Sequence, residues 1–138
     1  MSSLKTTITL DSSTLFPNPL SLKSTDTETI NGNSTSLITN QLQPSATEIL
    51  LETNEESGNS GVIYLYCQSA STNSNFGIDI YLTHKTNPDV TVHFARLLSG
   101  NAAFLPIYAA DANGILVNIK NNDPVSPSTV TYFYGSKD

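Results

Sequence analysis

The residues that could support catalysis are few and far apart in this sequence. Ser60 lies in a segment rich in Ser and Gly, residues 57–61. A serine nucleophile needs a general base and an oxyanion hole beside it. The two histidines are His84, in an expected turn, and His93, on the polar side of an expected strand. The segment therefore predicts a plain loop, and we expect no catalytic residues and no enzyme activity.

Metal and cofactor sites are not predicted either. His84 and His93 lack the close spacing that brings two ligands to one face, and the glycine of residues 111–114 comes too early for a calcium loop. Cys67, the single cysteine, alternates with apolar residues and is expected to be a small buried hydrophobe rather than a nucleophile. No glycine-rich phosphate loop is present. We expect no metal and no cofactor.

The charge of the chain argues against two classes of partner. Six Lys and Arg residues stand against twelve Asp and Glu, so the formal net charge is −6. Nucleic-acid affinity depends on clustered basic residues that contact phosphates, and the basic residues here are scattered. An anionic membrane surface requires the same excess of positive charge, and no apolar run is long enough to span a bilayer. We expect neither a nucleic-acid nor a membrane partner.

The hydrophobic pattern predicts strands throughout. Apolar and polar residues alternate with a period of two in many short segments separated by turn residues. The expected strands are residues 4–10, 47–51, 61–68, 77–83, 90–95, 102–108, 115–120 and 129–134. The two strands around Pro88 predict a hairpin, and Pro106 predicts an edge strand. The fold class is therefore all-β: an antiparallel β-sandwich of about eight strands, jelly-roll or Ig-like.

One domain with two unlike parts is expected. Residues 1–45 are rich in Ser, Thr and Asn and predict an N-terminal arm and outer strands, whereas residues 46–138 predict the sandwich core. The expected core residues are those on the apolar side of each strand. They are Ile63, Leu65, Ile78, Ile80, Val92, Phe94, Ile115, Val117 and Phe133.

Since no catalytic, metal or cofactor site is predicted, we expect the protein to act through contacts at its surface. A Thr-rich strand in the first ten residues could add to a neighbour's sheet edge. Tyrosines on strands could stack on sugars or anchor a protein interface, and ordinary sandwich packing is the alternative explanation. The candidate interface residues are Lys5, Thr7, Thr9, Phe16, Tyr64, Tyr81 and Tyr132.

The most distinctive segment is residues 94–106, Phe-Ala-Arg-Leu-Leu-Ser-Gly-Asn-Ala-Ala-Phe-Leu-Pro. It resembles a segment of small β-sandwich proteins in tailed-bacteriophage virions, among head decoration and head-fibre proteins. The resemblance extends over roughly residues 60–135 and includes the aromatic closing strand. It implies a non-enzymatic structural protein, made in the host cytoplasm and placed on the capsid surface. The implied partners are the major capsid protein and further copies of the chain, with a homotrimer as the first expectation.

Two other classes of protein remain open. A glycan-binding, lectin-like β-sandwich would use exposed tyrosines to stack on sugars. The coat protein of a small RNA virus would fit the length, but such a protein needs a basic RNA-binding face that this sequence lacks.

Overall fold

The computed structural model of the chain describes residues 2–14, 17, 20–30, 34, 36–53, 62–71, 75–108 and 114–137. These residues form ten strands and no helix, which confirms the all-β prediction. The strands are β1 (Ser2–Ser12), β2 (Leu20–Ile30), β3 (Ile38–Leu42), β4 (Thr47–Thr53), β5 (Val62–Ser71), β6 (Ile78–His84), β7 (Thr91–Leu97), β8 (Ala102–Tyr108), β9 (Ile115–Asn121) and β10 (Ser128–Lys137).

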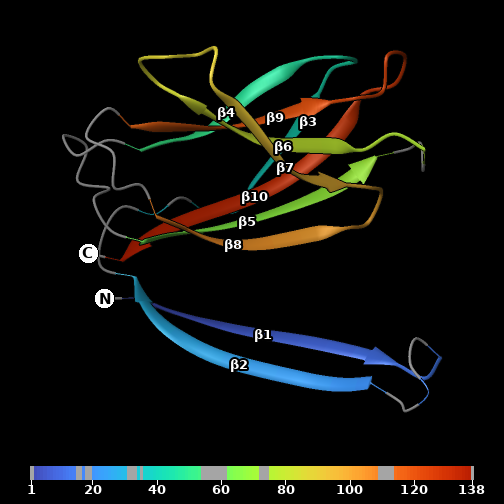
Figure 1. The fold of residues 1–138 in the computed structure, drawn as a ribbon, viewed down its shortest axis with the longest axis vertical. Coiled ribbons are helices and arrows are strands. Elements are labelled where there is room, and N and C mark those ends of the chain that lie inside the picture. Colours follow the sequence, from blue (N-terminus) through green and yellow to red (C-terminus); the bar gives the residue numbers. More distant parts are fainter. Residues whose placement is uncertain are drawn as a thin grey trace.

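Eight of the strands form a sandwich of two antiparallel sheets (Figure 1). One sheet has the order β3-β10-β5-β8 and the other has the order β4-β9-β6-β7. The chain passes between the two sheets at most connections, and β6–β7 is a hairpin within one of them. Eight strands arranged in this way make a jelly roll, which is one of the two sandwich types that the sequence left open.

The core lies between the two sheets and follows the period-two pattern of the sequence. Five of the predicted core residues are fully buried there: Ile63, Leu65, Ile78, Ile80 and Val117. Leu42, Cys67, Ile119 and Val130 complete the most deeply buried part of the cluster. Each of these side chains belongs to the inward face of its strand, because successive side chains of a strand point to opposite faces.

The prediction that Val92 and Phe94 are buried is wrong. Val92 is 54% exposed and Phe94 is 40% exposed. Their strand, β7, is an edge strand, and its register with β6 shifts so that Phe94 has no partner opposite it. The inward positions beyond this bulge belong to Ala95 and Leu97, since an extra residue exchanges the two faces of a strand.

The closing strand β10 has the opposite orientation to the one predicted, because the face that includes Phe133 points away from the core. Tyr132 and Tyr134 pack against the core from the inner side, whereas the predicted core residue Phe133 lies between them on the outer face and is only half-buried. Ile115, at the start of β9, is likewise half-buried. The strand alternates aromatic residues on both faces, so its pattern alone could not orient it.

Several local predictions are confirmed. β6 and β7 form the expected antiparallel hairpin, and β8, which contains Pro106, is an edge strand of its sheet. The strand predicted over residues 47–51 is present as β4 and extends to Thr53. The segments 57–61 and 111–113 lie outside the described residues.

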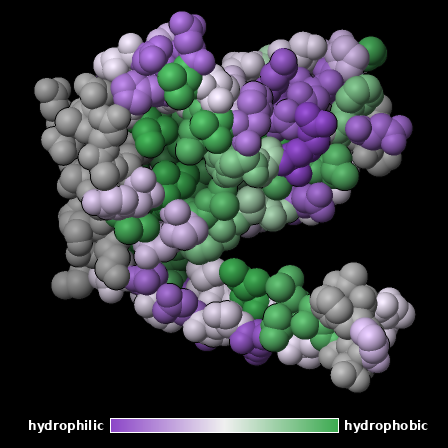
Figure 2. Space-filling view, viewed as in Figure 1, coloured by the Kyte–Doolittle hydropathy of each residue, from purple (hydrophilic) through white to green (hydrophobic). Residues whose placement is uncertain are grey.

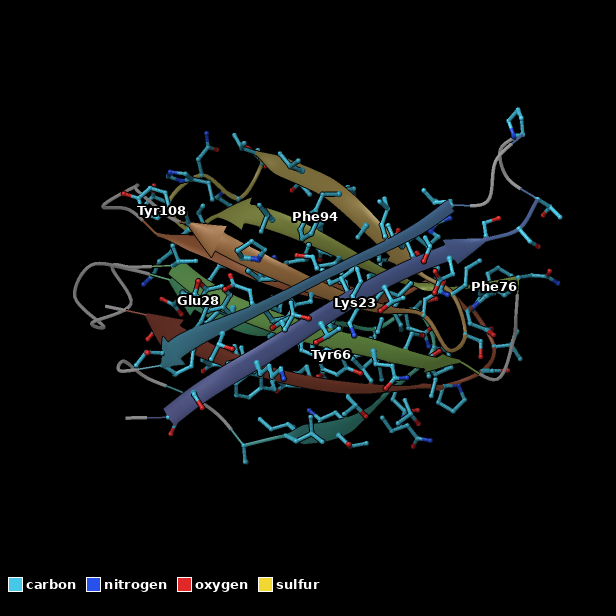
Figure 3. The ribbon with its side chains drawn as sticks, turned by 90° about the horizontal axis from the view of Figure 1, so that it is seen from below. Lys23, Glu28, Tyr66, Phe76, Phe94 and Tyr108 are labelled. Carbon is cyan, nitrogen blue, oxygen red and sulfur yellow. The ribbon has the colours of Figure 1, made fainter. Side chains whose placement is uncertain are left out.

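The remaining two strands, β1 and β2, form a long hairpin apart from the sandwich. They pair through eleven successive residue pairs, from Ser2–Ile30 to Ser12–Leu20. The hairpin crosses the outer face of the sheet that contains β10, β5 and β8 (Figures 1 and 3). Its base meets the sandwich where Ile30 is buried beside Gly135. β3 belongs to the sandwich, so residues 1–45 supply both this hairpin and one sandwich strand.

Candidate functional site

The hairpin β1–β2 has one apolar and one polar face. Its register places the even-numbered residues of both strands on the same side. This side, called here the apolar hairpin face, carries Leu4, Ile8, Leu10, Leu20, Leu22 and Ile30 together with six polar residues, among them Asp26 and Glu28, and it turns toward the sandwich (Figure 2). The opposite side consists of Ser, Thr, Lys and Asp residues. An amphipathic hairpin of this kind has one side suited to burial against another surface.

The surface opposite the hairpin is aromatic. The outer side of β5, β8 and β10, called here the aromatic face, carries Tyr64, Tyr66, Phe104, Pro106 and Phe133. The rings of Tyr64 and Phe104 are nearly parallel, with centroids 5.8 Å apart. Tyr66 stands opposite Phe104 on one side and Phe133 on the other. These rings lie outside the sandwich interior, on the side of the sheet that the hairpin crosses, where Tyr64 is buried and Tyr66, Phe104 and Phe133 are half-buried.

An open groove separates the apolar hairpin face from the aromatic face (Figure 2). Its larger part has a volume of about 350 Å³ and is lined by Thr6, Ile8, Ser24, Asp26, Glu28, Tyr64, Phe104 and Pro106. A second part of about 310 Å³ is lined by Leu4, Lys5, Thr6, Thr7, Ile8, Tyr66, Phe104 and Phe133. The sandwich wall is aromatic and apolar, whereas the hairpin wall of the larger part places Ile8 among Thr6, Ser24, Asp26 and Glu28, and the two walls do not close on one another.

The predicted interface residues on the hairpin lie on its polar face. Lys5, Thr7 and Thr9 are all exposed and alternate with the apolar residues of β1. Thr7 and Thr25 face each other across the hairpin, with their hydroxyl oxygens 3.2 Å apart. Phe16 lies outside the described residues. The predicted strand is therefore present; Lys5 and Thr7 are among the residues that line the second part of the groove, and Ile8 lines both parts.

The three predicted tyrosines lie on three different surfaces. Tyr64 is buried at the groove beneath the hairpin. Tyr81 is half-buried on the other sheet, where its ring stacks on His93 with centroids 4.9 Å apart. Tyr132 points into the sandwich rather than outward, and burial raises the pKa of its hydroxyl. The structure does not bring these tyrosines together, and only Tyr64 belongs to the groove.

His84 has a structural role in the turn between β6 and β7. The Nδ1 atom of His84 accepts a hydrogen bond from the backbone N–H of Asn87, at 3.2 Å, and so stabilises its turn. Within the described ranges, no three His, Cys, Asp or Glu side chains gather in a way that could hold a metal ion. The expectation that the protein has no enzyme activity stays a prediction.

Cys67 is fully buried among core residues, and this burial raises the pKa of its thiol to about 12. Because the thiolate is the reactive form, we expect no reaction of native Cys67 with a thiol reagent such as an aromatic disulfide at pH 8. Unfolding in denaturant should expose the group and give one equivalent of reaction. Spectrophotometric titration with and without denaturant measures both; rapid labelling of the native chain would contradict the burial.

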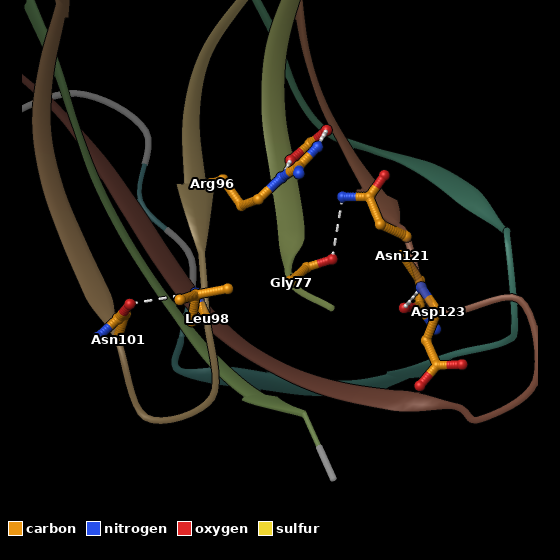
Figure 4. Close-up of polar contacts among 8 residues, drawn as sticks. Gly77, Arg96, Leu98, Asn101, Asn121 and Asp123 are labelled. Atoms are coloured by element: carbon orange, nitrogen blue, oxygen red, sulfur yellow. Dashed lines mark hydrogen bonds and ion pairs between the residues drawn. The ribbon is translucent and has the colours of Figure 1, made fainter. Parts of the chain in front are cut away.

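Asp79 and Arg96 form a two-pronged ion pair on the outer side of β6 and β7 (Figure 4). Arg96 donates from Nε to Asp79 Oδ1 at 2.5 Å and from Nη2 to Oδ2 at 2.8 Å. These hydrogen bonds lower the pKa of Asp79, against an opposing effect of burial. The pair satisfies both charges and joins β6 to β7 at the register pair Asp79–Arg96, which follows the bulge of β7 in the chain.

The lowered pKa of Asp79 predicts a contribution to acid sensitivity. A carboxyl whose pKa falls on folding adds stability above its unfolded pKa of about 3.9 and loses it as the pH drops through the folded value. Asp79→Asn should therefore cost about 1 kcal/mol at most at pH 7, because Arg96 is largely exposed. The melting temperature of the variant should fall less than that of the native chain between pH 6 and pH 2. An equal fall in both would show that the ion pair does not contribute.

The groove could not be predicted from the sequence, because neither the hairpin nor the aromatic face carries a recognisable sequence motif. The alternation of Leu4, Ile8 and Leu10 was visible, but residues 20–30 were not recognised as its partner strand. Leu20 and Leu22 give only a short apolar signal before a polar run that ends at Ile30. The prolines at 17 and 19, between two runs rich in Thr and Ser, were the available sign of a hairpin turn.

Among the described residues, no helix is present that could cross a membrane. No protein-family model matches the sequence, and no curated protein matches it. Among solved structures, the chain is similar to the crystal structure of Yersinia pseudotuberculosis-derived mitogen (YPM), with 20% identity and a TM-score of 0.47. That similarity covers 78% of this chain and 88% of the mitogen chain.

Proposed function

We propose that this protein is a non-enzymatic structural protein that acts through protein–protein contacts in a symmetric homo-oligomer, with a trimer as the first expectation, on the surface of a phage capsid. The observation that carries the proposal is the hairpin β1–β2, which has an apolar face but lies apart from the sandwich over most of its length. Decoration of the capsid and a place in a head fibre are both consistent with this function.

The energetics of the hairpin favour a partner. A two-stranded hairpin is at best marginally stable in water and needs a further surface against its apolar side. Ile8, Leu10 and Leu22 are 50%, 54% and 55% exposed, although all three belong to that side. Each square ångström of apolar surface removed from water contributes about 25 cal/mol. A second protein surface over these residues would stabilise the hairpin in a way that the single chain does not.

The assignment to a capsid surface has two supports. Jelly rolls of eight strands are an architecture of viral capsid and lectin domains, although fold alone does not decide function. Residues 94–106 resemble a segment of phage head proteins, and they form the end of β7, the turn and the start of β8. The acidic chain, with a net charge of −6, suits the outside of a particle better than contact with its packaged nucleic acid.

Two measurements on the full chain test the proposal. Light scattering should give a mass of several chains, three in the first expectation, where one chain has a mass of 14.8 kDa. Capsids assembled without this protein should bind it at a fixed ratio to the major capsid protein in a sedimentation assay. A monomer that leaves capsids unoccupied would contradict the proposed function.

A glycan-binding function is the alternative, and the lining of the groove favours it. The parallel rings of Tyr64 and Phe104 offer a flat apolar surface, and the carboxylate of Asp26 lies on the facing wall. Sugars present an apolar ring face together with hydroxyl donors, so this lining suits a sugar of one or two rings. Binding of the monomer to a glycan array, lost in Phe104→Ala but kept in Tyr81→Ala, would establish this alternative.

A further inference from the structure

The hairpin face that borders the groove has an acidic stretch in its middle. The register pairs Leu4 with Glu28 and Thr6 with Asp26, so both carboxylates lie on the side of β2 that turns toward the sandwich. They line the groove across from the aromatic face. A carboxylate beside an apolar surface loses hydration, which disfavours its charged form. A hairpin face that served only to pack on the sandwich would therefore carry aliphatic residues at these two positions.

The larger part of the groove has a negative charge that its own lining does not balance. Of the described residues that line it, Asp26 and Glu28 are charged and none is Lys, Arg or His. The two lysines of the hairpin, Lys5 and Lys23, belong to its opposite face. The net charge of the whole chain, −6, adds to the negative potential here. The groove is therefore complementary to an occupant with a positive charge and repels an acidic one.

The hairpin wall of the groove can accept hydrogen bonds from such an occupant. Asp26 is exposed, and its Oδ1 atom accepts from the backbone N–H of Thr27 at 2.8 Å. An ionised carboxylate has about four acceptor positions, so this contact leaves others for a ligand. The hydroxyl-bearing residues Thr6 and Ser24 line the groove beside it. A planar guanidinium matches a carboxylate with two parallel hydrogen bonds, which makes it the donor group that fits this wall best.

The sandwich wall suits the same group. The ring of Phe104 is half-buried and lies nearly parallel to the ring of the buried Tyr64, so it is held in place and still borders the groove. A guanidinium is weakly hydrated and is attracted to the face of an aromatic ring within about 6 Å of its centre. The aliphatic stem of an arginine would lie along Ile8 and Pro106, which are both exposed. A volume of about 350 Å³ is near the lower limit of ligand sites, so it suits one side chain rather than a globular surface.

We infer that the larger part of the groove binds an arginine side chain presented by a partner protein. Asp26 and Glu28 supply the negative charge on one wall, and Phe104 supplies the ring on the other. Arginine fits better than lysine, whose ammonium is more strongly hydrated and cannot pair with a carboxylate in two places. A neutral sugar would not use the negative charge of the groove. The inference goes beyond the proposed function, because it requires neither a capsid nor an oligomer.

Titration of the ¹⁵N-labelled full chain with a blocked Gly-Arg-Gly peptide, followed by NMR, tests the inference. The amide resonances of Thr6, Ser24 and Asp26 should shift. The matched peptide has citrulline in place of arginine, which keeps the shape and removes the charge, and it should bind at least about tenfold more weakly. An increase in ionic strength from about 0.01 M to about 1 M should also weaken the binding of the arginine peptide. Equal binding of both peptides, shifts confined to other parts of the chain, or no shift would overturn the inference.

A charge-removing variant tests the acidic wall. Asp26→Asn keeps the volume of an exposed side chain, so the chain should still fold, and the arginine peptide should bind about tenfold more weakly. Asp11→Asn is the matched control, because Asp11 is exposed on the polar face of the same hairpin. The affinity of this control should stay within about twofold, since distant exposed charges are screened. Equal weakening in both variants would mean that the net charge of the chain attracts the peptide, and would overturn the inference.

A second variant tests the aromatic wall and separates arginine from sugar. Phe104→Leu keeps an apolar side chain but removes the ring, so the arginine peptide should bind several-fold more weakly. Phe94→Leu, at an exposed position on the other sheet, should leave the affinity unchanged. A groove that binds N-acetylglucosamine in place of the arginine peptide, with a loss in Phe104→Leu, would overturn the inference in favour of a glycan. Light scattering and capsid sedimentation test the proposed function separately, so either result can fail without the other.

Discussion

Replacement of Leu65 by Ala is expected to lower the free energy of unfolding by about 2–5 kcal/mol. Leu65 is fully buried at the centre of β5, the strand that lies between β10 and β8. The substitution removes buried methyl groups and leaves a space that two hydrogen-bonded neighbouring strands cannot easily close. A loss of this size is a large part of the 5–15 kcal/mol that stabilises a typical domain.

Urea unfolding followed by circular dichroism or intrinsic tyrosine fluorescence measures this loss. Leu98→Ala is the matched control, because the same substitution is made at an exposed position in the turn after β7. We expect it to cost less than about 1 kcal/mol. Both variants should be compared at one protein concentration, since assembly also stabilises the native state. Equal losses in the two variants would contradict the core described for this sandwich.

The central strands could be predicted from the sequence because their two faces differ. Ile63 and Leu65, like Ile78 and Ile80, repeat every second residue between polar or aromatic neighbours, and this pattern fixed both the strand and its buried face. Phe94 shows where the pattern fails. A bulge at an edge strand inverts the phase of β7, and a bulge depends on the register with a strand elsewhere in the chain.

The groove could be predicted only in part. The Thr-rich first strand and its possible addition to another sheet were visible, but the sequence could not show which of its faces would meet the sandwich. Phe133 was expected to be buried, and this prediction is wrong. The strand has aromatic residues on both sides, so its sequence does not show which side faces the core. Phe133 belongs to the aromatic face because Tyr132 and Tyr134 take the inward positions of β10, and this orientation depends on the register of β10 with the distant strand β5.

Asn121, a polar residue that the sequence analysis did not single out, should contribute almost as much to the free energy of unfolding as Leu65. Asn121, at the end of β9, is fully buried, and its side chain joins three segments at one end of the sandwich. Its Nδ2 group donates to the carbonyl oxygens of Leu42, Gln43 and Ser126 at 3.2, 3.1 and 3.0 Å. Its Oδ1 atom accepts from the backbone N–H of Asp123 at 3.0 Å and from the Ser128 hydroxyl at 3.2 Å. Figure 4 shows the bond between Asn121 and Asp123.

Asn121→Ala is therefore expected to lower the free energy of unfolding by about 2–4 kcal/mol, because each buried group left without a partner costs about 1–3 kcal/mol. Asn121→Asp keeps the volume and the acceptor but removes the amide donors, so it should also destabilise the chain. Asn101→Ala is the control: Asn101 is exposed, and its side chain accepts from the backbone N–H of Leu98. Urea unfolding should show a loss below about 1 kcal/mol for this control. If Asn121→Ala cost no more than Asn101→Ala, the side chain of Asn121 would not be what holds β3, β9 and the turn before β10 together.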